Sequence, residues 1–246
     1  MDYDKDLSSM QVSTLEGKLH CMRHQTHGKR LVFLHGMGSS TRAWKRLLDY
    51  LPYDYDITLI DMLGHGLSDA PEVDYTVGLQ VHAVLDVMNT LGLHDCYLIG
   101  HSYGAWVAAI IAMTQKDTAG LVLEDPAGLS DYLYDIASSP AFEQNKDAML
   151  RELKILGNKE YVIRSMMENG ENPQGMLTRE NLRRISAPTL LVWGTNDYTI
   201  PIKYIDIFAS SIRKASTAKI QGAGHEPHYT NAKETADAII GFIGKP

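Results

Sequence analysis

The sequence has 246 residues, of which 44% are hydrophobic and 22% are charged, enough to build one domain with a large core. The formal net charge is −7 and no run rich in lysine and arginine occurs, which argues against a nucleic-acid partner because phosphate backbones are bound by clustered cations. The chain opens with the acidic segment MDYDKDLSSM, and no apolar run approaches the roughly 20 residues that cross a bilayer, so we expect a cytoplasmic protein without a membrane span.

The first two β-rich segments follow each other without a helix between them. QVSTLEG and KLHCMRHQ meet at Glu16 and Gly17, and this pattern predicts a β-hairpin. The two cysteines of the chain, Cys21 and Cys96, both lie in strand-like surroundings. We therefore expect buried, reduced thiols and no disulfide framework.

Beyond the hairpin, short apolar runs alternate with longer helical patterns. The apolar runs are LVFLH (31–35), ITLID (57–61), CYLIG (96–100), LVLED (121–125) and TLLVWG (189–194). Such continuous apolar composition is typical of strands covered on both faces and predicts a mostly parallel sheet. The helical patterns span 41–51, 77–91, 103–114, 201–210 and 232–243. This alternation predicts right-handed crossovers that place helices on both faces of the sheet.

The alternation breaks between Pro126 and Arg184. This stretch of roughly sixty residues is too long for a plain connection, and it contains the helix-like segments AFEQNKDAMLRELKIL and KEYVIRSMMEN. It predicts a small helical insertion at 126–185 in a core made of 1–125 and 186–246. We expect its aromatic and methionine side chains mainly to form a small core of its own: Tyr132, Tyr134, Phe142, Met149, Tyr161, Met166 and Met167.

Three residues with complementary chemistry follow predicted strands. Ser102 follows CYLIG, Asp197 follows LVWGT and His225 follows AKIQGAG. The segments after the strands of an open α/β sheet meet at its ligand-binding edge. A serine hydroxyl needs an adjacent base at neutral pH, and that base needs a carboxylate to fix its tautomer and stabilise its charged form. The three residues are therefore candidates for nucleophilic catalysis.

The pentapeptide GHSYG (100–104) surrounds the candidate nucleophile. Glycine and serine are common in ordinary turns, so the motif alone has a simple structural explanation. However, Gly100 and Gly104 also suit a turn so tight that side chains beside the serine would clash with the neighbouring strand and helix. A turn of that kind holds Ser102 out as a nucleophile.

Five segments in order resemble the α/β-hydrolase fold serine hydrolases, in particular carboxylesterases: HGMGSS, DMLGHGLSD, GHSYG, WGTNDYTIP and GAGHEPH. The resemblance covers nearly the whole chain. It implies an eight-stranded sheet with an antiparallel second strand and a cap inserted after strand six. It also implies that Ser102 is the nucleophile, His225 the general base and then acid, and Asp197 its orienting carboxylate. The implied oxyanion hole consists of the backbone N–H groups of Met37 and Tyr103.

The assignment of the acid has an alternative. Some enzymes of this fold carry the acid after strand six, which here would be Glu124 or Asp125. His225 and His228 could suggest a metal pair, but Pro227 lies between them and no HExxH helix is present. We expect neither a metal nor another cofactor.

The segment DMLGHGLSD is expected to be architectural. Gly64 and Gly66 are suited to the turn, and Asp61 and Asp69 are expected to hydrogen-bond loop amides. We assign this segment no chemistry.

The resemblance implies an enzyme that hydrolyses a small-molecule ester of small to medium acyl chain through an acyl-enzyme, and we expect a monomer or homodimer. The same triad serves carbon–carbon bond hydrolases, lactonases, perhydrolases and some amidases, and motifs do not separate these activities. A ligand receptor of the same fold with slow turnover is a further alternative. A Rossmann-type oxidoreductase is disfavoured because Thr41 occupies the third glycine position of HGMGSST and the motif does not follow the first strand of the alternating series.

Overall fold

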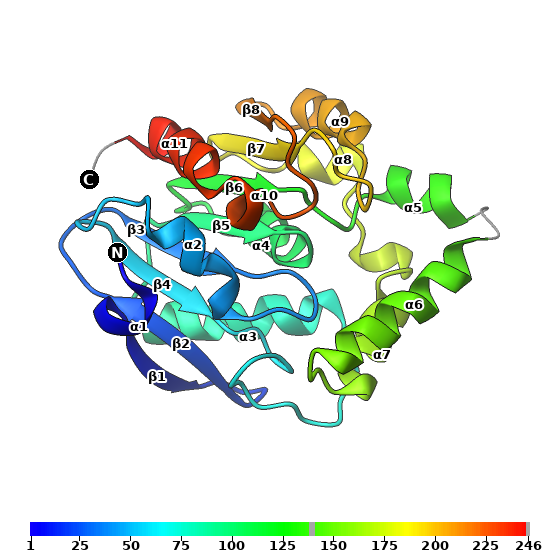
Figure 1. The fold of residues 1–246 in the computed structure, drawn as a ribbon, viewed down its shortest axis with the longest axis horizontal. Helices are drawn as coiled ribbons and strands as arrows, with labels where there is room; N and C mark the ends of the chain where they lie inside the picture. The colour runs from blue at the N-terminus through cyan, green and yellow to red at the C-terminus, as the bar shows by residue number, and fades with distance from the viewer. Residues whose placement is uncertain (138–140, 245–246) are drawn as a thin grey trace.

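A single mixed sheet forms the centre of the computed structural model, which describes residues 1–137 and 141–244, without the side chains of 136–145. The strands of this part of the chain are β1 (Ser8–Ser13), β2 (Lys18–His24), β3 (Arg30–Leu34), β4 (Asp56–Ile60), β5 (Tyr97–His101), β6 (Gly120–Glu124), β7 (Thr189–Gly194) and β8 (Ala215–Ile220). Their order across the sheet is β1-β2-β4-β3-β5-β6-β7-β8 (Figure 1). β2 runs antiparallel to its neighbours β1 and β4, and the other pairs are parallel. The predicted hairpin and the predicted sheet of eight strands are confirmed.

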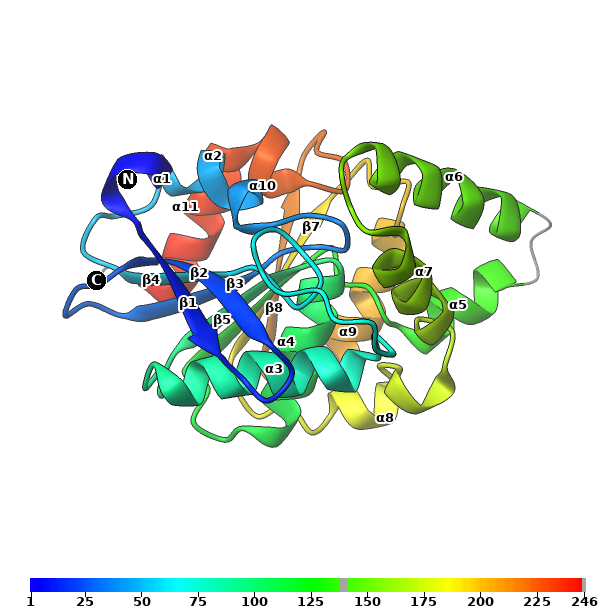
Figure 2. The same cartoon turned by 90° about the horizontal axis from the view of Figure 1, so that it is seen from below.

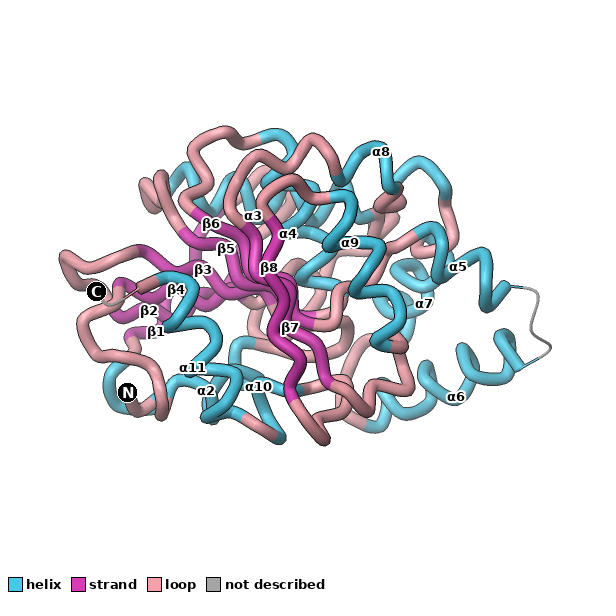
Figure 3. Tube along the Cα trace, turned by 90° about the horizontal axis from the view of Figure 1, so that it is seen from above, coloured by secondary structure: helices cyan, strands magenta, loops and turns pink. Residues whose placement is uncertain are grey.

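Helices cover both faces of this sheet, as predicted. One face carries α3 (Val77–Thr90), α4 (Tyr103–Thr114) and α9 (Ile205–Ser211), and the other carries α1 (Tyr3–Asp6), α2 (Lys45–Leu48), α10 (Pro227–Thr230) and α11 (Ala232–Ile243) (Figure 2). The strands therefore lie between two layers of helices (Figure 3).

Strand β3 illustrates why the central strands are apolar throughout. Leu31 and Phe33 pack with Trp44 on one face, while Val32 and Leu34 pack in the core of the other face. Successive side chains of a strand point to opposite faces, so a strand with helices on both sides has no solvent-facing positions.

Two of the predicted helices are shorter than expected. The pattern at 41–51 forms the 3₁₀ turn η1 (Thr41–Trp44) followed by α2, which ends at Leu48. Pro52 disfavours helical backbone at the residue before it, so the helix cannot extend to residue 51. The pattern at 201–210 starts as the 3₁₀ turn η3 (Ile202–Tyr204) and continues as α9. Pro201 itself has an extended backbone, with ψ of 138°.

The insertion follows β6 and is helical, as predicted. It contains α5 (Ser130–Ala137), α6 (Ala141–Ile155), α7 (Glu160–Asn169), the 3₁₀ turn η2 (Pro173–Gly175) and α8 (Arg179–Leu182). Helices α5, α6 and α7 extend to one side of the sheet (Figures 1 and 2). None of the helices in the described residues is both long and apolar enough to cross a membrane.

The expectation that the insertion forms its own small core is wrong. Its buried residues Val162 and Met166 belong to the same hydrophobic cluster as Tyr75 of the core. Three of the expected core residues are instead exposed: Tyr134, Met149 and Tyr161. Another, Phe142, lies outside the described side chains. Because α6 and α7 form a thin layer, each can bury only one face against the rest of the protein.

Candidate active site

Ser102 occupies the sharp turn between β5 and α4. Its backbone has φ of 51° and ψ of −114°, a conformation that costs a non-glycine residue about 1–3 kcal/mol. Main-chain hydrogen bonds hold it there: the Ser102 N–H donates to the Glu124 carbonyl at 2.9 Å, and the Ser102 carbonyl accepts from the Ala127 N–H at 3.1 Å. The start of the insertion therefore stabilises the strained serine.

The two glycines of the GHSYG motif are required by close contacts, as predicted. A Cβ atom at Gly100 would lie 2.4 Å from the carbonyl oxygen of Gly104. A Cβ atom at Gly104 would lie 2.3 Å from the carbonyl oxygen of Leu34 in β3. Both obstacles are backbone atoms, which cannot rotate away as a side chain could.

The structure brings the three predicted side chains together. His225 Nε2 lies 3.0 Å from Ser102 Oγ, and His225 Nδ1 lies 2.8 Å from Asp197 Oδ2. The other carboxylate oxygen, Asp197 Oδ1, accepts from the backbone N–H groups of Thr199 at 2.8 Å and Ile200 at 2.9 Å. The loop after β7 thus fixes the carboxylate with one oxygen facing the imidazole.

This arrangement determines the tautomer of the histidine. Burial alone would raise the pKa of Asp197. Hydrogen bonds from His225 and from the Ile200 N–H lower the pKa by more than burial raises it, so the pKa lies below its usual value. An ionised carboxylate only accepts hydrogen bonds, so His225 Nδ1 carries the proton. Nε2 is then free to accept the proton of the Ser102 hydroxyl.

The loop that carries Met37 lies against the nucleophile. A Cβ atom at Gly36 would lie 3.4 Å from the Cβ atom of Ser102. His35 Nδ1 donates to the Gly36 carbonyl at 2.8 Å, and its Nε2 accepts from the Met62 N–H at 3.0 Å. Burial lowers the pKa of His35, in agreement with this neutral form. Because the C=O and N–H of a trans peptide point in opposite directions, the Met37 N–H is directed away from His35.

The second predicted donor, the N–H of Tyr103, belongs to the first residue of α4. The first N–H groups of a helix have no acceptor within the helix, so this one is available to a ligand. The partial positive charge of the helix N-terminus adds to its preference for a negative oxygen. Tyr103 follows directly after Ser102, which places this N–H beside the nucleophile.

A model of the alpha/beta hydrolase family matches residues 31–238. The chain belongs to the alpha/beta hydrolase family. It is 24% identical to monoacylglycerol lipase abhd6-A of Xenopus laevis over 252 residues, which cover 87% of this chain and 74% of that protein.

Solved structures of other hydrolases share the fold. The crystal structure of a membrane phospholipase A described as a bacterial virulence factor has a TM-score of 0.79 and 23% identity, over 97% of this chain and 86% of that one. An enol-lactonase from Burkholderia xenovorans LB400 has a TM-score of 0.80 and 19% identity, over 96% of this chain and 100% of that one. At these identities the similarity concerns the fold.

The two alternative acids of this hydrolase have other partners. Glu124 accepts from the backbone N–H of His228 at 2.7 Å and from His228 Nδ1 at 2.9 Å. Asp125 accepts from the backbone N–H of Gly194 at 3.0 Å, and its carboxyl lies within 4.8 Å of Asp197 and His225. Burial, together with the carboxylates of Glu124 and Asp197, holds the pKa of Asp125 well above its usual value.

The same contacts bear on metal binding. Asp125, Asp197 and His225 each offer one ligand atom within 4.8 Å of the others, but the last two already share a hydrogen bond. His228 is paired with Glu124, so its Nδ1 is not directed at a site shared with His225. The arrangement favours an acid–base system of hydrogen bonds.

The DMLGHGLSD segment has the architectural role that the sequence predicted. Asp61 accepts hydrogen bonds from the N–H of Thr41, the first residue of η1, at 2.6 Å and from the loop N–H of Leu67 at 2.9 Å. Asp69 accepts from the N–H of Lys18 in β2 at 2.8 Å, so its partner is a strand amide and not the predicted loop amide. Gly64 and Gly66 both adopt positive φ, at 85° and 53°.

A contact between the insertion and the loop that carries Met37 was not predicted from the sequence. Asn158 Nδ2 donates to the Gly38 carbonyl at 2.8 Å and to the Leu153 carbonyl at 3.0 Å. The side chain of Leu153 packs so closely on Gly38 that a Cβ atom there would lie 2.4 Å away. Gly38 has φ of 73°, which favours glycine. These residues are about 120 positions apart in the chain, so no local pattern could reveal the contact.

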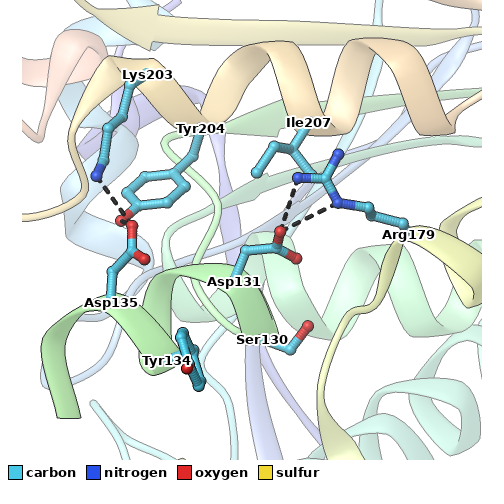
Figure 4. Close-up of a pocket in the computed structure, with 8 residues that line it drawn as sticks. All are labelled: Ser130, Asp131, Tyr134, Asp135, Arg179, Lys203, Tyr204 and Ile207. Atoms are coloured by element: carbon cyan, nitrogen blue, oxygen red, sulfur yellow. Dashed lines mark hydrogen bonds and ion pairs between the residues drawn. The ribbon is translucent and has the colours of Figure 1, made fainter. Parts of the chain in front are cut away.

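A cavity of about 590 Å³ opens between α5, α8 and α9 (Figure 4), and none of the three candidate catalytic residues lines it. It is lined by Ser130, Asp131, Tyr134, Asp135, Arg179, Lys203, Tyr204 and Ile207. Its charged groups neutralise one another: Asp131 pairs with Arg179 at 2.8 Å and Asp135 with Lys203 at 2.9 Å. The Asp135–Lys203 pair ties α5 to the core, and the Asp131–Arg179 pair joins α5 to α8 within the insertion. We assign the cavity no chemistry.

Proposed function

We propose that the chain is a serine hydrolase that cleaves carboxylic esters of small to medium acyl chain through an acyl-enzyme. The observation that carries the proposal is the continuous pair of hydrogen bonds from Ser102 Oγ to His225 Nε2, at 3.0 Å, and from His225 Nδ1 to Asp197 Oδ2, at 2.8 Å. This geometry matches the requirement of a nucleophile for a base and of the base for an orienting carboxylate.

The reaction has two steps. Ser102 Oγ attacks the ester carbonyl while His225 Nε2 takes the hydroxyl proton, and Asp197 stabilises the imidazolium. The N–H groups of Met37 and Tyr103 receive the negative oxygen, and His225 then gives its proton to the departing alkoxide. Water repeats the sequence on the acyl-enzyme and releases the acid and free Ser102.

We also propose that residues 126–185 act as a cap over the core formed by 1–125 and 186–246. Leu153 of α6 packs against Gly38 next to the proposed oxyanion hole, which limits the space for an acyl chain. On the other side, Tyr132 of α5 donates a hydrogen bond to the Thr199 carbonyl at 2.8 Å, two residues after the catalytic acid. Similarity to a monoacylglycerol lipase supports an ester as the substrate class.

The test is turnover of p-nitrophenyl acetate and butyrate by the wild type, Ser102→Ala and the control Ser210→Ala, which alters a serine on α9. Loss of a triad serine costs about 10⁶-fold in rate, so Ser102→Ala should be inactive while Ser210→Ala matches the wild type. A fluorophosphonate probe should label the wild type at Ser102. A wild type that is neither active nor labelled, or an active Ser102→Ala variant, would contradict the proposal.

The ester class is tested separately with an acyl-chain-length series run beside amide and lactone substrates. We expect the highest kcat/KM for esters of short to medium acyl chain. A preference for the amide or lactone would show that the same triad serves another bond.

A further inference from the structure

His101, the residue before the nucleophile in GHSYG, contacts the loop that carries His225. This loop, residues 221–226 between β8 and α10, is called the histidine loop below. It is the last residue of β5 and is 4% exposed. Its Nε2 lies 2.7 Å from the backbone carbonyl oxygen of His225. The strand that presents Ser102 is thereby joined directly to the backbone that presents the base.

Ring packing reinforces this hydrogen bond. The His101 ring lies 5.0 Å from the His225 ring and 4.7 Å from the His228 ring, measured between centroids. The interplanar angles are 56° and 60°, so each ring meets its neighbour at a tilt. The His101 side chain thus contacts both the backbone and the imidazole of the candidate base.

His101 also contacts the loop that carries Met37. This loop, residues 35–40 between β3 and η1, is called the oxyanion loop below. A Cβ atom at Gly36 would lie 2.8 Å from His101 Nδ1 and 3.1 Å from its Cε1. Only a residue without a side chain allows the two to approach this closely. One imidazole therefore lies where the nucleophile strand, the histidine loop and the oxyanion loop meet.

The chemistry of this contact fixes the state of His101. A carbonyl oxygen only accepts, so Nε2 must carry a proton. Burial is the main reason why the pKa of His101 lies well below its usual value, and the nearby His228 and His225 lower it in addition. The ring is therefore neutral, and Nδ1 bears no proton. The donor to His225 is therefore permanent near neutral pH.

A second anchor holds the other end of the histidine loop. Glu124 binds both the backbone N–H and Nδ1 of His228, at 2.7 and 2.9 Å, and both side chains are almost completely buried. The backbone is thus fixed at residue 228 by β6 and at residue 225 by β5. The loop after β7 also binds the start of this segment, through the Asn196 N–H to the Ala223 carbonyl at 2.8 Å and the Gly222 N–H to Thr195 Oγ1 at 2.8 Å. His101 adds the hydrogen bond to the backbone of His225 itself.

We propose that His101 is a positioning residue that sets His225 at hydrogen-bonding distance from Ser102 and holds the oxyanion loop in register with both. The proposal rests on the proposed function of Ser102 and His225. Displacement of a catalytic group by about 1 Å can cost about 10²-fold in rate, so loss of this hydrogen bond is expected to lower kcat more than it raises KM.

The experiment compares His101→Phe with His101→Gln. Phenylalanine keeps a ring of similar size but cannot donate, whereas glutamine offers an N–H at a similar distance from the backbone. For p-nitrophenyl butyrate we expect kcat to fall about 10- to 100-fold in His101→Phe with little change in KM, and His101→Gln to recover most of that loss. Equal losses in the two variants, or wild-type kcat in a folded His101→Phe variant, would overturn the proposal.

A double-mutant cycle with Gly36→Ala tests the second contact and does not depend on the phenylalanine variant. The added methyl group should lower kcat in the wild-type background, and His101→Ala should relieve part of that loss, so the two effects should be non-additive. Additive losses would show that His101 does not hold the oxyanion loop.

Wild-type turnover and fluorophosphonate labelling of Ser102 separate this inference from the function on which it rests. If both fail in the wild type, the proposed function is wrong and the positioning role falls with it. If both succeed while the His101 variants behave like the wild type, only the positioning role is wrong.

Discussion

Replacement of Asp125 by asparagine should stabilise the protein at neutral pH. The Asp125 side chain is fully buried, and burial beside the carboxylates of Glu124 and Asp197 holds its pKa well above its usual value. Asparagine keeps the oxygen that accepts from the Gly194 N–H and tolerates the positive φ of 43° at this position. The substitution therefore removes an ionisable group and preserves the hydrogen bond to Gly194.

The size of the effect follows from linkage between proton binding and folding. Below the ordinary value of 3.8, Asp125 is protonated in both the folded and the unfolded chain, and its ionisation does not affect stability. Between that value and the raised pKa of the folded state, only the unfolded chain releases the proton, so the wild type loses about 1.4 kcal/mol of stability per pH unit. The advantage of Asp125→Asn should grow at this rate with rising pH and become constant above the raised pKa.

The assay is urea denaturation of the wild type and Asp125→Asn at a series of pH values from 3 to 8, with the difference in unfolding free energy plotted against pH. Other titrating groups largely cancel in that difference. Asp125→Ala is the control: it should show the same slope, displaced to lower stability by about 1–3 kcal/mol because the Gly194 N–H loses its acceptor. A difference that stays flat, or that falls as pH rises, would refute a protonated Asp125.

Three further outcomes are expected. Gly104→Ala should lower the unfolding free energy by about 3 kcal/mol or more in urea denaturation, because its Cβ atom would lie 2.3 Å from the main-chain oxygen of Leu34. Stability close to that of the wild type would contradict the tight turn. Asp61→Ala should lower the unfolding free energy at pH 7 by at least about 2 kcal/mol, because the backbone N–H groups of Thr41 and Leu67 lose a buried acceptor. A smaller loss would argue against the architectural role. Asn158→Ala should lower kcat for p-nitrophenyl butyrate about 10-fold, because the Gly38 carbonyl loses its donor, and should also lower the melting temperature, because the Leu153 carbonyl loses the same donor. An unaltered kcat in the folded variant would show that this contact does not support the oxyanion loop.

The fold could be predicted where one physical requirement dominates a segment. A strand covered on both faces must be apolar at every position, as 31–34 in β3 are, so the central strands were evident from composition. The insertion was evident only as a gap in the alternation. Val162 and Met166 pack with the main core, a long-range choice that the local helical pattern does not encode.

The candidate site was predictable to the extent that its residues follow strands. The turn at Ser102 needs small neighbours, and this need is visible in the sequence as two glycines. The contacts that tie these segments together are different. His101 reaches the carbonyl of His225 across 124 positions, and Asn158 reaches Gly38 across 120, so they become apparent only once the chain is folded.

The choice among the three acids shows how the sheet decides what the sequence leaves open. β6 lies between β5 and β7, so the residues that end β6 lie between the nucleophile and the loop of Asp197. Glu124 is occupied by the backbone and ring of His228, and Asp125 closes the edge between β6 and β7 through the Gly194 N–H. Asp197, one strand further, has one oxygen held by its own loop and the other directed at His225. Proximity to the serine in the sheet therefore does not select the acid of the proposed triad. Asp197 is favoured because its oxygen lies 2.8 Å from His225 Nδ1, whereas Asp125 binds the Gly194 N–H and burial favours its protonated form.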